Sequence, residues 1–147
     1  MWTYSFLDVQ AAITGPGAAF SLGAGSGAAE EGITVEPSGD INAMTHGADG
    51  TPMHSLLADK TGHVTCRFLK TSQVNSLLAA ALAFQRASSA NHGQNTISIV
   101  NTVSGDVITC QAVAFAKVPT VDYGAEGKMV EWKFDAGIID VAFGAGT

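Results

Sequence analysis

Three of the four histidines in this chain, His46, His54 and His63, lie near one another in the sequence. Imidazole nitrogens bind zinc well, and a long loop could fold two or three of them together. Their spacings match no helical pair and no zinc finger, and exposed loop or strand positions explain them equally well. Asp49 and Asp59 lack the regular acidic ladder of a calcium-binding hand, so we expect them to be solvated turn formers. The sequence therefore predicts no metal site.

The other motifs of catalytic or nucleotide-binding type are incomplete. The glycine run at residues 23–27 lacks the preceding strand and following helix that a dinucleotide-binding loop requires. Residues 124–128 are too few for a phosphate-binding loop, and Met129 stands where Ser or Thr would bind magnesium. No serine lies in a Gly-x-Ser-x-Gly elbow, and neither cysteine lies in a nucleophile signature. We expect no enzyme activity and no cofactor, and look for the function in self-assembly or binding.

Length and charge narrow the class of protein further. A chain of 147 residues suits one domain with a sizeable core. The formal net charge of −6 has the wrong sign for gripping phosphate backbones, although it suits a passage through which DNA slides. No signal peptide is recognisable, and the longest apolar run, residues 77–84, is too short to span a bilayer. We expect a soluble protein that folds in a reducing cytoplasm, with free thiols at Cys66 and Cys110 favoured over a bridge.

The chain is predicted to be mostly β, because apolar and polar residues alternate along much of it. A first strand carries its apolar side chains at Leu7, Val9, Ala11 and Ile13 and ends in a turn at residues 15–17. Residues 18–32, mainly Ala, Gly and Ser, fit either a flexible loop or a weak strand. Further strands are predicted at residues 33–36, 63–69, 96–101, 106–118 and 129–143, with a hairpin connection at residues 101–106.

One helix is predicted over about residues 72–87. Its apolar positions recur at helical spacing, at Val74, Leu77, Leu78, Ala81 and Leu82. Thr71 or Ser72 can cap its first turn, and Arg86 suits the dipole near its end. The apolar stripe should lie on the sheet.

Two irregular regions are also predicted. Residues 37–62 form a long excursion with few large hydrophobic residues, part of which could be a hairpin, and they are the best internal candidate for a contact arm. In the last strand the apolar phase shifts from Val130, Trp132 and Phe134 to Ile139, Val141 and Phe143. A β-bulge near residues 136–137 would produce that shift, so we expect the sheet to bend or change neighbours there.

Several segments together carry a resemblance to a known family. They are residues 32–40 (GITVEPSGD), residues 46–50 (HGADG), residues 58–62 (ADKTG) leading into residues 68–72 (FLKTS), residues 93–96 (GQNT), and residues 130–137 (VEWKFDAG). This pattern resembles the tail tube proteins of contractile-tailed bacteriophages and prophages over roughly residues 4 to 143. The whole pattern is moderately specific, and no single piece is.

The resemblance implies a fold and a mode of assembly. It implies one tail tube domain over residues 1–147, an antiparallel β-sandwich or barrel with one flanking helix, and a long contact loop at residues 37–62. Six subunits would close into a ring, and rings would stack into a hollow tube that DNA crosses without specific binding. The implied partners are the contractile sheath, a tape measure protein inside the tube, a baseplate or tail-tip initiator and a tail terminator. The implied location is the virion, after assembly in the host cytoplasm, with no membrane contact.

Site residues follow from the resemblance as expectations. The carboxylates expected to face the lumen and repel DNA are Glu36, Asp40, Glu131 and Asp135. The residues expected to contact a neighbouring subunit or ring are Asp40, Asn42, His46, Asp49, His54, Asp59 and Lys60. Two other functions stay open: the tube of a type VI-like secretion system, and a monomeric β-sandwich binding module. An aromatic ligand face would favour the module, but the aromatic residues are scattered along the chain.

Overall fold

The computed structural model describes residues 3–23 and 28–144 and is mainly β, as predicted. One α-helix, α1 (Val74–Arg86), and two short 3-10 helices, Phe6–Asp8 and Ser89–Asn91, accompany nine strands. The strands are β1 (Val9–Gly15), β2 (Ala18–Ser21), β3 (Ala28–Pro37), β4 (Asn42–His46), β5 (Pro52–Leu56), β6 (Gly62–Leu69), β7 (Asn95–Asn101), β8 (Val107–Phe115) and β9 (Met129–Ala142). None of the described helices is long and apolar enough to cross a membrane.

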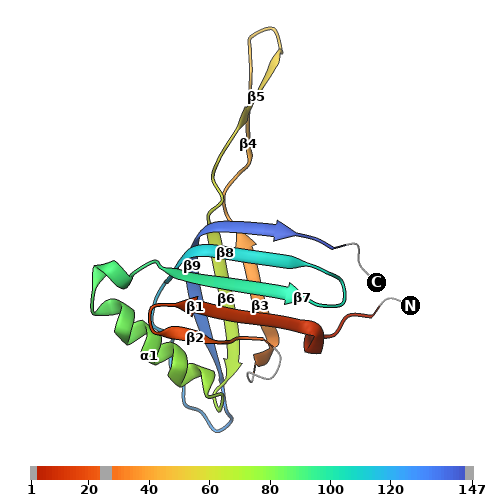
Figure 1. Ribbon diagram of the computed structural model, residues 1–147. Helices are drawn as coiled ribbons and strands as arrows, with labels where there is room; N and C mark the ends of the chain where they lie inside the picture. The colour runs from red at the N-terminus through yellow and green to blue at the C-terminus, as the bar shows by residue number, and fades with distance from the viewer. Residues whose placement is uncertain (1–2, 24–27, 145–147) are drawn as a thin grey trace.

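Seven strands form one antiparallel sheet in the order β2-β1-β7-β8-β9-β6-β3. The sheet folds over itself, so that β1, β7 and β8 cross in front of β3 and β6 in Figure 1. Strand β9 belongs to both layers, since its first half pairs with β6 and its second half pairs with β8. A strand that turns such a corner is typical of orthogonally packed β-sandwiches. The two remaining strands, β4 and β5, form a separate hairpin that extends away from the body (Figure 1).

The core lies between the two layers and under α1. Side chains that alternate along β6 and β9 face it, among them Val64, Cys66 and Phe68 from β6 and Trp132 and Phe134 from β9. These are the inward positions that the alternation predicts. The other residues of the core come mainly from β1, β7, β8 and α1, and include Ile13, Ile97, Val113, Leu78 and Ala81.

The predicted helix is confirmed, with differences at its surface. Val74, Leu78 and Ala81 are buried, whereas Leu77 is exposed and the polar Gln85 is almost fully buried. Gln85 is not one of the apolar positions from which the helix was predicted. It is buried because its amide pairs with the side chain of Asn95 at the start of β7, through two hydrogen bonds of 2.7 and 2.8 Å.

The predicted phase shift in the last strand is confirmed at Ile139 alone, since Val141 and Phe143 are exposed, and the predicted β-bulge in this strand is absent. Ala136 and Ile139 are both buried, and β9 exchanges β6 for β8 around this point. The register between β8 and β9 is nevertheless the same on both sides of Gly137, so no β-bulge separates the two strands there. Instead both strands change phase together, because Ala112, which lies against Gly137, adopts a positive φ of 53°.

The structure also decides three other predictions. Leu7 lies in a 3-10 helix and is exposed, so the first strand begins at Val9 rather than at Leu7. Residues 18–21 and 28–37 are strands, which favours the strand alternative for much of the segment 18–32, while residues 24–27 lie outside the described part. Cys66 and Cys110 are free buried thiols, as favoured from the sequence.

Candidate functional site

The most exposed element is the β4–β5 hairpin, which we call the arm (residues 38–61). The sequence predicted a contact loop at residues 37–62, part of which could be a hairpin. The central part of that segment does form a β-hairpin. Every residue of β4 and all but one of β5 are exposed, including the apolar Met44, Met53 and Leu56. A two-stranded hairpin alone in water is marginally stable at best. The arm thus offers both faces, with their apolar side chains, to a partner.

Aspartates shape the tip and the base of the arm. At the tip, Asp49 accepts a hydrogen bond of 3.1 Å from the backbone N–H of Thr51. At the base, Asp59 accepts bonds from the backbone N–H and the hydroxyl of Thr61, at 3.0 and 2.7 Å. These donors lower the pKa of both carboxyl groups, so both stay charged at neutral pH. Both residues are turn formers, as predicted, and both keep a negative charge on the arm.

The other arm residues named from the sequence are distributed along it. Asn42 and His54 face each other across the hairpin, with Asn42 Nδ2 3.3 Å from His54 Nδ1. His46 ends β4 opposite Pro52. Asp40 is exposed in the connection that precedes β4, and Lys60 at the other side of the base bonds Asp140 of β9 at 3.1 Å.

The structure does not gather the three histidines that were weighed as ligands. His46 and His54 lie on the arm, whereas His63 lies on β6 with its Nδ1 2.9 Å from Asp135 Oδ1. Within residues 3–23 and 28–144, no group of three or more His, Cys, Asp or Glu side chains is placed to hold a metal ion.

The outward face of β3, β6 and β9 carries a ladder of charged side chains, which we call the charged face. Successive side chains of a strand point to opposite faces of the sheet. In β6 and β9 the inward side chains are apolar, so the polar side chains point outward. Register then places Arg67 of β6 opposite Glu131 of β9, and His63 opposite both Glu36 and Asp135. Neighbouring strands in a sheet are thus joined by side chains as well as by backbone hydrogen bonds.

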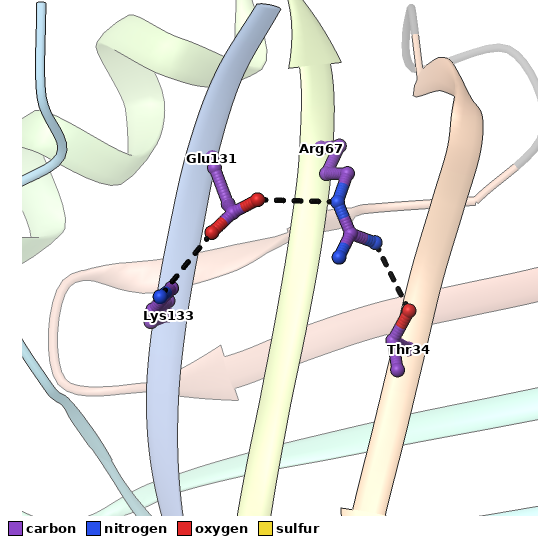
Figure 2. Close-up of polar contacts among 4 residues, drawn as sticks. All are labelled: Thr34, Arg67, Glu131 and Lys133. Carbon is purple, nitrogen blue, oxygen red and sulfur yellow. Dashed lines mark hydrogen bonds and ion pairs between the residues drawn. The ribbon is translucent and has the colours of Figure 1, made fainter.

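Figure 2 shows the centre of this ladder. Arg67 Nε lies 3.2 Å from Glu131 Oε2, and its Nη1 donates to Thr34 Oγ1 of β3 at 3.0 Å. Lys133 lies 3.4 Å from the other oxygen of Glu131. The side chain of Arg67 is only 18% exposed, so this pair is the best shielded of the ladder. Arg67 of β6 thus connects its strand to both neighbours, β9 and β3.

Three of the four carboxylates expected to face a lumen lie on the charged face. Glu36, Glu131 and Asp135 belong to it, whereas Asp40 lies beyond the end of β3 at the base of the arm. Asp40 therefore lies outside the strands. The face also carries Arg67 and Lys133, so its charges largely cancel. These cations are visible in the sequence as the polar positions of β6 and β9, but only the register reveals that they pair with the carboxylates.

Among the described strands the sheet does not close into a barrel, so it has two free edges. Within that part of the chain, β3 pairs with β6 only and β2 with β1 only. A cavity of about 250 Å³ lies on the open side, lined from one layer by Val9 and Ile99 and from the other by Ile33 and Val35. Free edges with unpaired backbone groups invite pairing with another chain unless assembly covers them.

A folded antiparallel sheet with one helix, free edges and a long unpartnered arm describes a structural subunit built for assembly. Three solved structures share the fold. The anti-feeding prophage tube-terminating cap is 10% identical, with a TM-score of 0.56 over 97% of this chain and 93% of that chain. The sheath/tube terminator of the PVC extracellular contractile injection system in its extended state is also 10% identical, with a TM-score of 0.57 over 97% and 98%. A chain of the extended PVC sheath-tube complex is 8% identical, with a TM-score of 0.56 over 96% and 92%.

The family is shown by a whole-chain match. Residues 1–144 match the family described as Bacteriophage PhiTE tail tube protein, and the chain belongs to that family. No curated protein sequence matches the chain. The protein is therefore a structural tail tube protein of a contractile tail system and not an enzyme, and its family implies a component of the virion tail.

Proposed function

We propose that this protein is the subunit of a phage tail tube in which six copies form each ring. Stacked rings form a hollow conduit for DNA passage into the host, surrounded by a contractile sheath. The single observation that carries this proposal is the arm, whose strands are exposed on both faces and have no partner within the described chain. A neighbouring subunit or ring supplies the partner that the arm lacks.

Ring closure would satisfy the free edges of the sheet. Strands β2 and β3 each have one unpaired side, and repeated pairing between neighbouring copies would turn open sheets into one closed barrel. The single domain would thus contribute its sheet to the ring and its residues 37–62 to contacts beyond it. The proposed contact residues are Asn42, His46, Asp49 and His54 on the arm, with Asp40, Asp59 and Lys60 at its base.

The tube would engage further proteins along its length. We propose the contractile sheath on its outside, a tape measure protein within the growing tube, an initiator at the baseplate or tail tip, and a terminator at the other end. Two of the structures with this fold are a tube-terminating cap and a sheath/tube terminator, and the third belongs to a sheath-tube complex, which supports the choice of partners. Assembly would take place in the host cytoplasm.

We also propose that the charged face lines the lumen. Glu36, Glu131 and Asp135 would present carboxylates to DNA, with Asp40 near the rim. The paired Arg67 and Lys133 leave this wall weakly acidic, so DNA would slide past it without binding. A density map of the assembled tube tests this, and side chains on the outer wall would refute it.

Electron microscopy of the purified protein across a concentration series tests the proposed function. Six-fold rings or hollow tubes of uniform width are expected. If the protein stays dispersed, tail-tip proteins are added as nucleators, and dispersed monomers even then would favour a binding module.

The tube of a secretion-type injection machine is the second candidate. The two structures from an extracellular contractile injection system, which match at least 96% of this chain, favour it. The two candidates differ in cargo. Tubes attached to DNA-filled heads in purified particles would support the phage tail, and headless sheathed tubes would support the second candidate.

A further inference from the structure

The cavity of about 250 Å³ between the two layers lies beside the edge formed by β3, and we call it the edge cavity. Most of its wall is apolar and includes Tyr4, Phe6, Val9, Ile33, Val35 and Ile99. Asn101 and Asp106 supply the polar part of the wall. The carboxylate of Asp106 is held in place, since its Oδ1 accepts a hydrogen bond of 2.8 Å from the backbone N–H of Gly144. The edge cavity is therefore suited to an apolar occupant.

Leu77 and Phe84 of α1 expose an apolar surface elsewhere on the molecule, which we call the apolar flank. The two residues lie about two helical turns apart, so both project from the same side of α1. Leu77 is 44% and Phe84 52% exposed. The side chain of Phe84 lies over the β1–β2 turn, since a Cβ on Gly17 would come within 3.0 Å of it. The apolar flank therefore borders β2, the strand at the other free edge of the described sheet.

The charges near the apolar flank do not oppose its burial in such a cavity. The chain carries 13 Asp and Glu residues, yet none of them lies between Asp59 and Asp106 in the sequence. Arg86 is the one charged residue in the sequence of α1, and it lines a separate pocket together with Leu82. The apolar flank can thus be buried beside Asp106 without placing a second carboxylate of α1 next to it.

The apolar flank cannot reach the edge cavity of its own chain. Val9, the first residue of β1, lines the cavity, whereas Phe84 lies over Gly17, just beyond the end of that strand. The seven residues of β1, at about 3.3 Å each, separate the two sites by roughly 20 Å. In Figure 1, α1 lies at the left of the body and the N-terminal segment lies at the right. Only a second molecule can bring this flank to the cavity.

The two free edges of the described sheet place these surfaces on the same side of it. On β3, Ile33 and Val35 face the core side and line the edge cavity. On β2, Ala18 and Phe20 face the core side, against which α1 also packs. A second copy whose β2 continues the sheet beyond β3, with its core side on the same side, therefore brings its α1 to the mouth of the cavity.

We infer that the edge cavity of each copy is filled by Leu77 and Phe84 of the neighbouring copy in the ring. The contact buries apolar surface of both copies, and it is heterologous, because cavity and flank lie at opposite ends of β1. Backbone pairing between β2 and β3 alone allows several registers, since its hydrogen bonds repeat along the strands. An aromatic side chain in a cavity selects one of them. This inference rests on the proposed ring and identifies the side chains that set its register.

A charged substitution on the apolar flank tests the inference, and the next residue of α1 supplies the control. Phe84→Glu in the full chain removes the aromatic side chain and brings a carboxylate towards Asp106. Ala83→Glu introduces the same charge at an exposed position on another side of α1. The concentration needed for ring formation, measured by sedimentation and electron microscopy, should rise about tenfold or more for Phe84→Glu, because aromatic anchors carry much of the energy of an interface. It should change by less than about threefold for Ala83→Glu, provided that urea titration shows both variants to be folded.

A disulfide between copies gives a second measurement, which does not require Phe84→Glu to fold. Phe84→Cys and Tyr4→Cys copies are mixed under oxidising conditions, since Tyr4 lines the edge cavity and is exposed, and the native thiols are buried. A mixed disulfide that forms faster than with Ala83→Cys in place of Phe84→Cys supports the contact. Equal rates, normal rings of Phe84→Glu, or equal loss in both Glu variants overturn the inference and leave the tube proposal intact. Wild-type protein that forms no ring even with tail-tip nucleators overturns both.

Discussion

The buried amide pair of Gln85 and Asn95 should be worth several kcal/mol to the folded subunit. Asn95 is fully buried and Gln85 nearly so. Gln85 Nε2 donates to Pro16 O and Asn95 Oδ1 at 2.9 and 2.7 Å, and Asn95 Nδ2 donates to Gln85 Oε1 and Val113 O at 2.8 and 3.0 Å. The pair therefore links α1, the β1–β2 turn, β7 and β8.

Asn95→Leu keeps the size of the side chain and removes three of these four bonds. Gln85 Oε1 and Val113 O each lose the donor from Asn95, and an unsatisfied buried group costs about 1–3 kcal/mol. We expect the free energy of unfolding to fall by about 2–5 kcal/mol. This is a large share of the roughly 5–15 kcal/mol typical of a domain. Urea titration of the monomeric protein measures it, with the exposed Gln94→Leu as the control, expected within about 0.5 kcal/mol of wild type.

The double variant Gln85→Leu/Asn95→Leu decides whether the pair acts as a unit. Replacing both amides leaves only the two backbone carbonyls without their side-chain donors, so it should cost less than the sum of the single variants by at least about 1 kcal/mol. Additive effects, or a single-variant loss no larger than that of Gln94→Leu, would refute the reasoning.

Three further predictions concern single positions. Gly62→Ala should lower the free energy of unfolding by about 1–3 kcal/mol, because its Cβ would overlap the Glu36 carbonyl oxygen, whereas Gly127→Ala, in open space, should be neutral in the same titration. Ala112→Gly should raise the midpoint of thermal unfolding, because Ala112 sits at a positive φ that glycine adopts without strain; a lower midpoint would contradict this. Burial raises the pKa of Cys66 to about 12 and that of Cys110 to about 11 from 9.0, so both thiols should resist a thiol reagent at pH 8 until the protein unfolds. As pH rises, the thiols ionise in the unfolded chain before they ionise in the folded protein. The contribution of the two buried thiols to the free energy of unfolding is therefore complete below pH 9 and is lost as pH rises towards 11–12. This loss should be smaller in a variant with both cysteines changed to Val.

The sequence was sufficient where a local period decides the structure. Val64, Cys66 and Phe68 alternate with polar residues and are all fully buried on β6. The helical spacing from Val74 likewise located α1 to within two residues at its start and one at its end. These patterns work because side-chain direction follows from backbone geometry alone.

Features that depend on distant partners could not be predicted in the same way. Gln85 is polar, and only the position of Asn95 at the start of β7 makes its burial in α1 favourable. The change of phase near Gly137 was visible, but its cause lies in Ala112 of the neighbouring strand. Long-range pairing of this kind carries no local signal, since the two residues are unrelated in sequence spacing.

Net charge is the clearest case in which composition and arrangement lead to different physical conclusions. The value of −6, taken alone, suggests a uniformly acidic wall that repels DNA. On the charged face, however, Arg67 and Lys133 are paired with Glu131, which removes most of that repulsion. Which of these charges pair across β6 and β9 therefore decides the electrostatic potential of this face, and the sum of charges over the chain does not.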